Sequence, residues 1–411
     1  MGRTLPTPPV INNQERRPFW ISLKNGLITG ASNNDPSGIV TFAQIGAITN
    51  LALGWLLLLL TPLVINIEEM SARVGEVTQI GVNKLIRQIY GIWLAVTVAA
   101  LIFITNVVTL GANVSAMAEI AAWYIPLPWQ VLAILFVAIF MWILFRGNYK
   151  IISRYLLFAS GLLIFYVLTL LYADIDWINL SFAMPKVGMG LIAAAAVALV
   201  GNMLPPYLIF WQATEEIEEH KRIRDIPRES LGVIMGFVYS AVIALAIILL
   251  ASEVIGNGEL LENSNQLAIM LTPLAGKWAF HLFAIALIGS GFLGIPILAS
   301  SAAYVGAEAF NLPEGWHASR KKTKIFFSIL AGTLLMGAVT MLFSIPAVQL
   351  LFYTQVLNGF LVPILIITLL LIANNSELMR NHKNNLLNNI AGVALLIITI
   401  TADIFLLINL F

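Results

Sequence analysis

The stretch that decides the fold is Asn33-Asn34-Asp35-Pro36-Ser37-Gly38, a polar, proline-containing interruption of an apolar segment. A second interruption, Asn202-Met203-Leu204-Pro205-Pro206-Tyr207, occupies the equivalent place in the other half of the chain. In hydrocarbon every backbone N–H and C=O group must be satisfied internally, so such breaks are tolerated only where they line a protein cavity. Matching breaks in two halves of a membrane protein are typical of a transport site.

The composition of the 411-residue chain is that of a membrane protein. Hydrophobic residues make up 59% of the chain, charged residues 10%, and the mean hydropathy is +0.90. Soluble domains carry about 25% charged residues, so we expect a polytopic protein whose main partner is the lipid bilayer. The net charge of +1 gives no indication of a nucleic-acid partner. The absence of cysteine excludes disulfides and thiolate chemistry.

Eleven apolar runs are long enough to cross a bilayer, which takes about 20 residues. They lie at 20–48, 51–72, 92–123, 129–146, 151–173, 188–213, 229–253, 277–309, 323–344, 347–373 and 389–410. With a cytoplasmic N-terminus, 20 of the 22 basic residues fall on the cytoplasmic side, leaving Lys186 and Lys277 outside. The positive-inside rule therefore predicts a cytoplasmic N-terminus and an extracytoplasmic C-terminus. Residues 1–19 are polar and show no cleavable signal, so the first segment is expected to be retained in a bacterial inner membrane or a plasma membrane.

Asp35 is the only acid well inside the first segment. A carboxylate at bilayer depth costs about 2.5 to 3.5 kcal/mol, so the presence of Asp35 there calls for a structural or functional explanation. One is capping, since Asp followed by Pro is a good start for the second half-helix. The other is cation binding, because the half-helices present carbonyl ends, each worth about −0.5 charge, near the midplane. Half-helix N-termini at Ser37 and Tyr207 would suit an anion, but Asp35 favours a cation.

The side chains around the breaks are almost all oxygen donors. The predicted metal ligands are Asp35, Asn34, Asn33, Asn202 and Gln355. Backbone groups at the two breaks would add carbonyl oxygens or hold the helices open; these residues are Ala31, Ser32, Pro36, Ser37, Gly38, Met203, Leu204, Pro205, Pro206 and Tyr207. Such donors favour hard ions such as Mg²⁺, Ca²⁺ or Mn²⁺ over ions that prefer sulfur or imidazole. Met203 is the one sulfur candidate, and packing explains it equally well.

Other polar residues in the apolar segments allow two interpretations. Asn106, Thr109, Asn113 and Asn358 either line a hydrophilic pathway or form hydrogen bonds between helices. A second set, Glu68, Glu69 and Arg73, would form ion pairs or an inner gate. The charged stretch from Glu215 to Glu229 is expected to be a solvated connector.

Several motifs resemble those of the Nramp family of divalent-metal transporters, and more closely its Nramp-related magnesium transporter branch. They are the run at 26–31 leading into Asp35-Pro36-Ser37-Gly38, the stretch 70–78, the stretch 206–212 and the stretch 355–363. The resemblance implies the leucine-transporter fold, an all-α membrane protein of 11 helices in which helices 1 and 6 are broken. It divides the chain into a tail at 1–19, a first inverted repeat at 20–173, a second at 174–373, and a loop with the last helix at 374–411.

The departures from the metal-transporting pattern concern the expected ligands. Asp35 matches the family's binding aspartate and Gln355 its glutamine in helix 10, whereas Gly38 replaces an asparagine ligand. Pro205-Pro206-Tyr207 stands where typical members carry Met-Pro-His, and the acids of helix 3 appear as Asn106 and Thr109. The sequence thus lacks the thioether that prefers transition metals and the histidine linked to proton movement.

These patterns favour the hypothesis that the protein is a carrier for a hard divalent cation, Mg²⁺ first and Mn²⁺ second. The carrier would work by alternating access without obligatory proton coupling. The metal is the substrate, and no cofactor is expected. Alternatives are a carrier for an amino acid or organic cation, and a non-transporting membrane receptor or interaction protein. An enzyme is least expected, because no nucleophile–base pair, phosphate loop or metal-hydrolase spacing is present. The oligomeric state is left open, and a monomer is one option.

Overall fold

The computed structural model describes residues 19–146, 157–173, 175, 186–219, 221, 223–256, 258–316, 320–340 and 345–410. Within these ranges the regular structure is entirely helical. Eight helices or helix pairs in the described part are long and apolar enough to cross a membrane. They are α3 (Gly54–Thr78), α5 (Ile92–Ala121), α6 (Trp129–Arg146), α9 (Met189–Met203) with α10 (Pro206–Glu218), α11 (Ile226–Val254), α14 (Ala279–Ala309) with its short lead-in α13 (Thr272–Ala275), α16 (Ala347–Ala373) and α18 (Leu386–Leu410).

The remaining predicted segments appear as shorter helices. The first is α1 (Phe19–Ser32) followed by α2 (Pro36–Thr49), and the others are Leu157–Tyr172, which contains α8 (Ile164–Tyr172), and α15 (Lys324–Val339). Each of the eleven predicted runs therefore contains helix in the described residues, and eight of them are long and apolar enough to cross a membrane. The parts of two runs at 151–156 and 341–344 lie outside the described residues. Short connectors are α4 (Val82–Tyr90), η1 (Ile223–Asp225), α12 (Ser264–Ile269), η2 (Gly276–Trp278), α17 (Ser376–Met379) and η4 (Arg380–His382).

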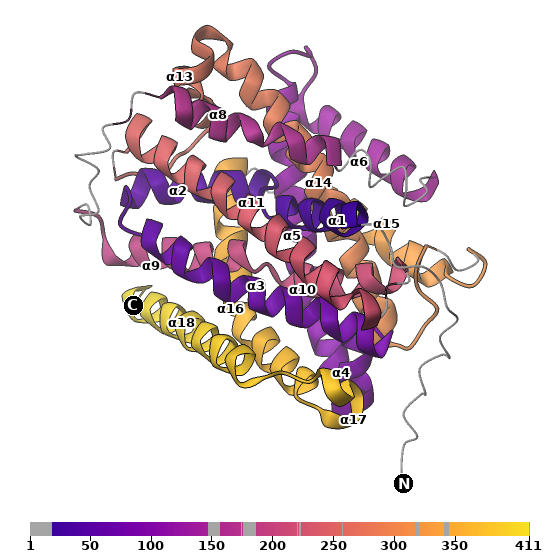
Figure 1. Ribbon diagram of the computed structural model, residues 1–411. Coiled ribbons are helices and arrows are strands. Elements are labelled where there is room, and N and C mark those ends of the chain that lie inside the picture. Colours follow the sequence, from indigo (N-terminus) through magenta and orange to yellow (C-terminus); the bar gives the residue numbers. More distant parts are fainter. Residues whose placement is uncertain are drawn as a thin grey trace.

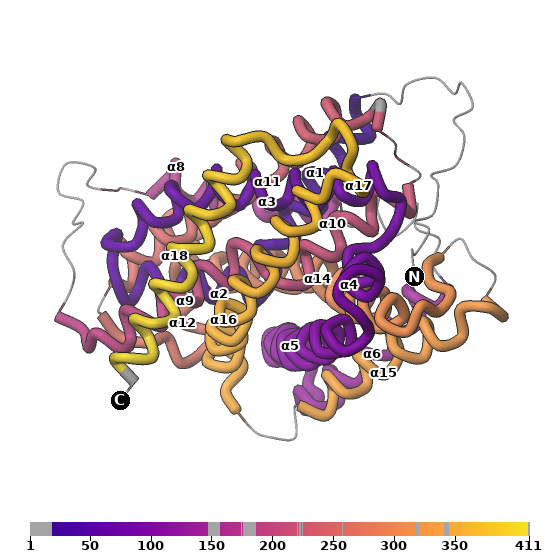
Figure 2. The backbone as a smooth tube through the Cα atoms, turned by 90° about the horizontal axis from the view of Figure 1, so that it is seen from below, coloured from indigo at the N-terminus to yellow at the C-terminus, as the bar shows by residue number. Residues whose placement is uncertain are grey.

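The helices form two packed sets with α16 between them. The first set contains the broken helices, α1 with α2 and α9 with α10, packed against α3 and α11. The second set contains α5, α6, α14 and α15. Figure 2 shows α5 nearly end-on while α3 and α18 run across the view, so α5 crosses them steeply. The α18 helix lies along one edge of the molecule, against α9, α16 and α3 (Figure 1).

Burial places the broken helices at the centre. In the most apolar part of the span Met189–Glu218, 94% of residues are buried, against 22% in Leu386–Asn409. Large apolar side chains such as Trp142 on α6 and Leu387 on α18 are exposed. An exposed apolar surface of this extent fits contact with lipid rather than water, as the composition predicted.

Small residues allow the first broken helix to lie directly on α11. Gly26 and Gly30 on α1 face Gly232 and Gly236 on α11 so closely that a Cβ atom at any of these positions would overlap the opposite backbone. Each pair is spaced by four residues, which puts both members on one helix face. This is the small-residue packing that brings membrane helices together.

The same contact recurs with the roles of the two halves exchanged. In each half the broken helix packs on the second membrane helix of the other half, since α1 and α2 lie on α11, and α10 with part of α9 lies on α3. Gly75 of α3 approaches the backbone of Ala213 on α10 in the way that Gly26 approaches Gly232. This reciprocity is what two inverted five-helix repeats produce. The boundaries at 173/174 and 373/374 remain a prediction.

Candidate functional site

The first break is built around Asp35. The α1 helix ends at Ser32 and α2 begins at Pro36, and Asp35 occupies the N-cap position between them with extended backbone (φ −65°, ψ 177°). Its Oδ1 atom accepts hydrogen bonds from the Gly38 backbone N–H (2.9 Å) and the Ser37 hydroxyl (2.5 Å). Pro36 at the first helical position adds a fixed φ and needs no acceptor. The capping interpretation of Asp35 is therefore confirmed, and it leaves the second carboxylate oxygen for another role.

That second oxygen is held by α5. Asn113 Nδ2 donates to Asp35 Oδ2 over 2.7 Å, and Asn113 Oδ1 accepts from the Ser37 N–H over 2.9 Å. The Asn113 side chain thus binds the start of α2 through both its amide nitrogen and its amide oxygen. Asp35, Ser37 and Asn113 are each at least 98% buried by exposed area, so these bonds are shielded from water and correspondingly strong.

A third helix, α16, extends the network. Gln355 Nε2 donates to Ser37 Oγ over 2.7 Å, and Asn358 Nδ2 donates to Gln355 Oε1 over 3.1 Å. The structure thus joins Asp35 to Gln355 through Ser37 rather than directly. Both predicted α16 residues lie at the site, and Asn358 belongs to it as a partner of Gln355.

The two breaks touch each other. The α9 helix ends at Met203 and α10 begins at Pro206, with Pro205 at an N-cap that has no side-chain acceptor. Asn33 Nδ2 donates to the Met203 carbonyl over 3.2 Å, and Asn202 Nδ2 approaches the Asn33 carbonyl at 3.5 Å. A Cβ atom on Gly38 would lie 3.3 Å from Asn202 Oδ1. Asn202 therefore lies beside the position at which typical members of the resembled family carry an asparagine side chain.

Two buried amide oxygens at the first break have no hydrogen-bond donor among the described residues. They are Oδ1 of Asn33 and Oδ1 of Asn34. Asn34 points towards α11, where its Nδ2 donates to Ser240 Oγ over 2.9 Å, and so does not join the Asp35 network. Buried polar atoms are nearly always paired, so these two oxygens are the clearest open ligand positions at the break.

Helix α14 closes the site opposite the network, a contact that the sequence analysis missed. A Cβ atom on Gly294 would lie 2.5 Å from the Asp35 Cβ and 2.7 Å from Asp35 Oδ2. Only a glycine leaves room for the carboxylate here. The signal in the sequence is the cluster of Gly289, Gly291 and Gly294 in this segment. Nothing in that cluster identifies Asp35 as the residue it contacts.

The pathway candidates on α5 divide in the structure. Asn106 Nδ2 donates to the Leu298 carbonyl over 3.0 Å, which favours the interpretation as a bond between helices. The Thr109 hydroxyl is buried and has no partner among the residues that the structure describes. Asn113 lies at the centre of the site, so its role is larger than that of a pathway residue.

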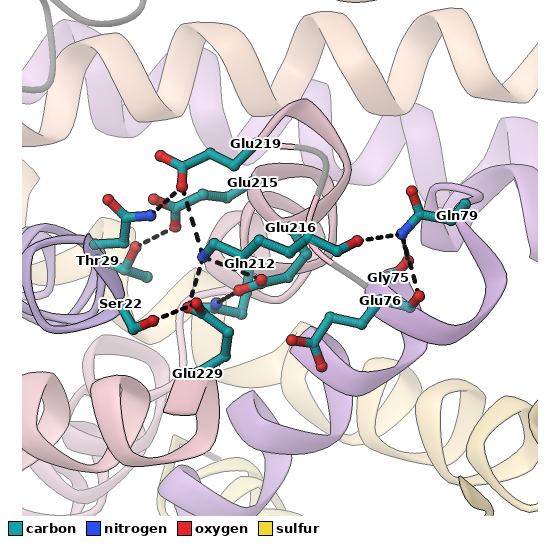
Figure 3. A network of polar contacts seen from close by, with 12 residues as sticks. Ser22, Thr29, Gly75, Glu76, Gln79, Gln212, Glu215, Glu216, Glu219 and Glu229 are labelled. Atoms are coloured by element: carbon teal, nitrogen blue, oxygen red, sulfur yellow. Dashed lines mark hydrogen bonds and ion pairs between the residues drawn. The ribbon is translucent and has the colours of Figure 1, made fainter. Parts of the chain in front are cut away.

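The connector from Glu215 to Glu229 is not a solvated loop, and that prediction was wrong for its described residues. Lys221 is 1% exposed, and its Nζ lies 2.7 Å from Glu229 Oε2 and 3.0 Å from Glu216 Oε2. Figure 3 shows these carboxylates converging on the one ammonium group, with Glu76 of α3 and Gln79, the C-cap of that helix, beside them. Burial alone lowers the pKa of Lys221, but the surrounding carboxylates outweigh it and raise that pKa well above its usual range. Mixed charge in the sequence resembled a solvated surface because it could not show that the charges pair.

This inner network ties α1 to the α10–α11 connector (Figure 3). The Thr29 hydroxyl donates to Glu215 over 2.7 Å, Asn25 Nδ2 donates to Glu219 over 2.5 Å, and the Ser22 hydroxyl donates to Glu229. On the other side Gln79 Nε2 donates to the Lys221 carbonyl over 2.7 Å. The network thus seals the end of the first helix set that is predicted to face the cytoplasm.

Of the two interpretations of Glu68, Glu69 and Arg73, the ion pair was wrong for Glu68, and the inner gate stays a prediction. Arg73 donates to Asn384 over 2.6 Å, and the Ser230 hydroxyl donates to Glu69. Both carboxylate oxygens of Glu68 are buried without a hydrogen-bond partner in the described part of the chain. Nor do the described residues contain a cluster of three or more His, Cys, Asp or Glu side chains arranged to hold a metal ion, so a metal here would rely on amide and carbonyl oxygens as well as carboxylate.

A family model settles which proteins this architecture belongs to. The model described as natural resistance-associated macrophage protein-like, Nramp, matches residues 26–409. The chain belongs to the Nramp family. The resemblance seen in the sequence motifs is thus confirmed over nearly the whole length, whereas the magnesium branch within the family is not distinguished by this match.

Individual relatives of this Nramp chain are distant. It is 28% identical over 180 residues to the divalent metal cation transporter MntH of Vibrio campbellii, covering 43% of this chain and 39% of the relative. It is 24% identical over 266 residues to MntH of Yersinia pestis, covering 62% of each chain. The alignments therefore span less than two thirds of these curated relatives. Both are described as transporters, in agreement with the expectation that the chain is not an enzyme.

Solved structures confirm the fold. A manganese transporter from Eremococcus coleocola superposes with a TM-score of 0.75 at 15% identity, covering 97% of this chain and 88% of that one. MhsT in complex with L-phenylalanine gives 0.63 at 12% identity, covering 95% and 98%. A transporter of the nucleobase-cation-symport-1 family gives 0.57 at 16% identity, covering 94% and 92%. The Nramp chain therefore has the leucine-transporter fold, whose members in these structures have different substrates.

Proposed function

We propose that this Nramp protein carries a hard divalent cation across the membrane by alternating access, with Mg²⁺ as the first candidate and Mn²⁺ as the second. The observation that carries the proposal is the site where the two broken helices meet, which is buried, contains the carboxylate of Asp35, and around it offers amide, hydroxyl and carbonyl oxygens. Such donors are those that Mg²⁺ and Mn²⁺ accept. The relatives described as divalent metal cation transporters support the same class of substrate.

The proposed ligands follow from the contacts. Asp35 supplies the charge, and the open Oδ1 atoms of Asn33 and Asn34, with the carbonyls at the end of α9, supply neutral oxygens. A cation that binds Asp35 Oδ2 competes with the Asn113 donor, and once displaced the Asn113 amide can turn its oxygen to the ion. Asn202 and Gln355 would bind directly or through water. Mg²⁺ dehydrates reluctantly, so water-mediated contacts suit it.

Uptake needs no proton under this proposal. An inside-negative potential supplies about 2.3 kcal/mol per charge per 100 mV, so a divalent cation gains about twice that on entry. The described groups that hydrogen-bond to the Asp35 carboxylate belong to Ser37, Gly38 and Asn113, and none of them is a histidine or a carboxylate that could take up its proton. We place the protein in a bacterial inner membrane with its N-terminus in the cytoplasm, as the distribution of basic residues suggests.

Flux measurements test the proposal. The full chain is reconstituted in proteoliposomes under an inside-negative potential, and uptake of Mg²⁺, Mn²⁺ and Cd²⁺ is followed together with internal pH. Entry of Mg²⁺ or Mn²⁺ without acidification, lost in Asp35→Ala, is the expected result. Preference for Cd²⁺ would contradict the hard-ion assignment. Internal acidification that accompanies metal entry would contradict uncoupled transport. Absence of uptake for all three ions would overturn cation transport and favour an organic substrate.

A further inference from the structure

The carboxyl group of Glu68 is buried and has no hydrogen-bond partner among the described residues. Its side chain is 0% exposed, and neither Oε1 nor Oε2 has a hydrogen-bond partner in the described part of the molecule. No ion pair found among the described residues includes it. An ionised carboxylate buried in this way costs several kcal/mol. A purely structural position would favour glutamine or an apolar residue, so the acid indicates a missing partner.

The register between α3 and α10 places Glu68 at the second break. The Ser71 hydroxyl donates to the Ile209 carbonyl over 2.5 Å, and Gly75 meets Ala213 four residues further along both helices. The two pairs have the same sequence separation, so the helices run parallel in constant register. Since Glu68 lies one turn before Ser71 on the same face of α3, it is level with Pro206, the first residue of α10.

This position connects the two halves of the site. Tyr207, the second residue of α10, lies within electrostatic reach of both Asp35 and Glu68. The N-terminal end of α10 has a proline cap without a side-chain acceptor, and a helix N-terminus favours a nearby negative charge. Towards the predicted cytoplasmic side, α3 continues for two turns to Glu76 beside the inner network (Figure 3). Glu68 therefore lies at the second break, about two turns of α3 from the inner network.

We propose that Glu68 is a second cation-binding carboxylate, which receives the divalent ion at the second break after it leaves Asp35 on the way to the cytoplasm. The inference rests on the proposed function. One carboxylate leaves a divalent ion with a surplus positive charge, and a second carboxylate along the path neutralises part of that charge where water is scarce. The ion supplies the partner that Glu68 lacks, and the start of α10 tolerates the ionised group when the ion has moved on.

The test compares Glu68→Gln with a matched change at its neighbour. Glu69→Gln is the control, because Glu69 is only partly buried and accepts a hydrogen bond from Ser230 at the edge of the bundle. Glu68→Gln is expected to lower maximal Mn²⁺ uptake at least ten-fold while the Kd for Mn²⁺, measured by calorimetry on the purified full chain, changes less than three-fold. Glu69→Gln is expected to behave as the unmodified protein in both measurements, and Glu68→Asp to recover part of the uptake.

Stability gives an independent readout. Glutamine has the shape of glutamate and removes an unpaired acid, so the melting temperature of Glu68→Gln is expected to be unchanged or higher. A lower melting temperature with proportionally less folded protein would assign Glu68 a structural role and overturn the proposal. If Glu68→Gln takes up Mn²⁺ as fast as the unmodified protein while Asp35→Ala takes up none, Glu68 does not bind the ion. The proposed cation transport would be unaffected by that result. Absence of both Mg²⁺ and Mn²⁺ flux in the unmodified chain would instead refute the proposed function, and this inference with it.

Discussion

Asn113 donates its amide N–H to Asp35 over 2.7 Å and takes the Ser37 backbone N–H on its amide oxygen over 2.9 Å. One side chain of α5 thus bridges the carboxylate and the first turn of the helix that the carboxylate caps. Because α5 belongs to the second helix set and α2 to the first, this pair joins the two sets at the site. Three protein donors already contact the carboxylate, so a cation that binds Oδ2 competes with the Asn113 donor and can thereby loosen one set from the other.

Asp35→Asn separates capping from cation binding. Asparagine caps a helix about as well as aspartate and keeps an oxygen for Gly38, but its amide nitrogen faces the Asn113 donor. The melting temperature is therefore expected to fall slightly, by the loss of that one hydrogen bond, which is worth about 1 kcal/mol. Without the charge, Mg²⁺ or Mn²⁺ uptake is expected to fall at least a hundred-fold. Asp35→Ala loses the cap as well, which costs about 1 kcal/mol, and should lower the melting temperature in addition. Normal uptake in Asp35→Asn would mean that the residue only caps α2.

Asn113→Asp tests the bridge by adding charge. The new carboxylate can still accept the Ser37 N–H but can no longer donate to Asp35, so the two acids repel each other until a cation lies between them. Calorimetry at pH 8 is expected to show Mn²⁺ binding at least five-fold tighter than in the unmodified protein. Asn113→Leu removes both hydrogen bonds without adding charge, and is the control. If both variants bind Mn²⁺ equally, Asn113 does not lie in the ion's first coordination sphere.

Gly294→Ala tests the fit between α14 and Asp35. A methyl group there would lie 2.5 Å from the Asp35 Cβ and must displace the carboxylate or the helix; overpacking of this kind typically costs about 1 to 3 kcal/mol. We expect uptake to be lost and the melting temperature to fall by several degrees. Gly332→Ala on α15 meets nothing within 4 Å and should be harmless in both assays. Equal behaviour of the two variants would show that α14 does not confine Asp35.

The fold was predictable because lipid imposes simple rules. Segment length and the distribution of basic residues located the apolar helices from Phe19 to Leu410, and proline next to polar residues marked both breaks. The contact between the breaks followed from the family resemblance. Boundaries were less accurate at the polar ends, where α3 continues to Thr78 and α10 to Glu218, because burial of charged residues in the inner network extends these helices beyond their apolar parts.

The site was predictable in composition but not in connectivity. Sequence placed Asp35, Asn33, Asn202 and Gln355 together, since they flank the breaks or match a motif. It could not show that Asn113 holds Asp35, because an asparagine in a membrane helix has several equivalent explanations. Pairing was also invisible in the inner network and at Glu68. The charges that pair around Lys221 are close in sequence, but the sequence could not show that they are buried against one another. Whether an acid has a partner is a property of the packed structure.

From the inner network we predict that the ion pairs of Lys221 keep the site closed to the cytoplasm. Its ammonium group compensates Glu216 and Glu229, which are buried with it at 2.7 to 3.0 Å. Lys221→Met leaves these acids without their cation, and breaking a buried ion pair costs about 3 to 5 kcal/mol. Water can relieve that cost by entering between α1 and the α10–α11 connector, so the variant should favour a conformation open to the cytoplasm.

Thiol labelling measures this opening directly. The chain contains no cysteine, so Ser32→Cys, at the buried end of α1, provides a single reporter. With Lys221→Met, we expect a membrane-impermeant maleimide added to inside-out vesicles to label Cys at this position at least ten-fold faster than without it. Lys322→Met, which removes an exposed lysine from the same predicted side, is the control and should leave the rate unchanged. Equal labelling in the two double variants, with both proteins folded, would mean that the Lys221 ion pairs stabilise the connector without closing the path to the site.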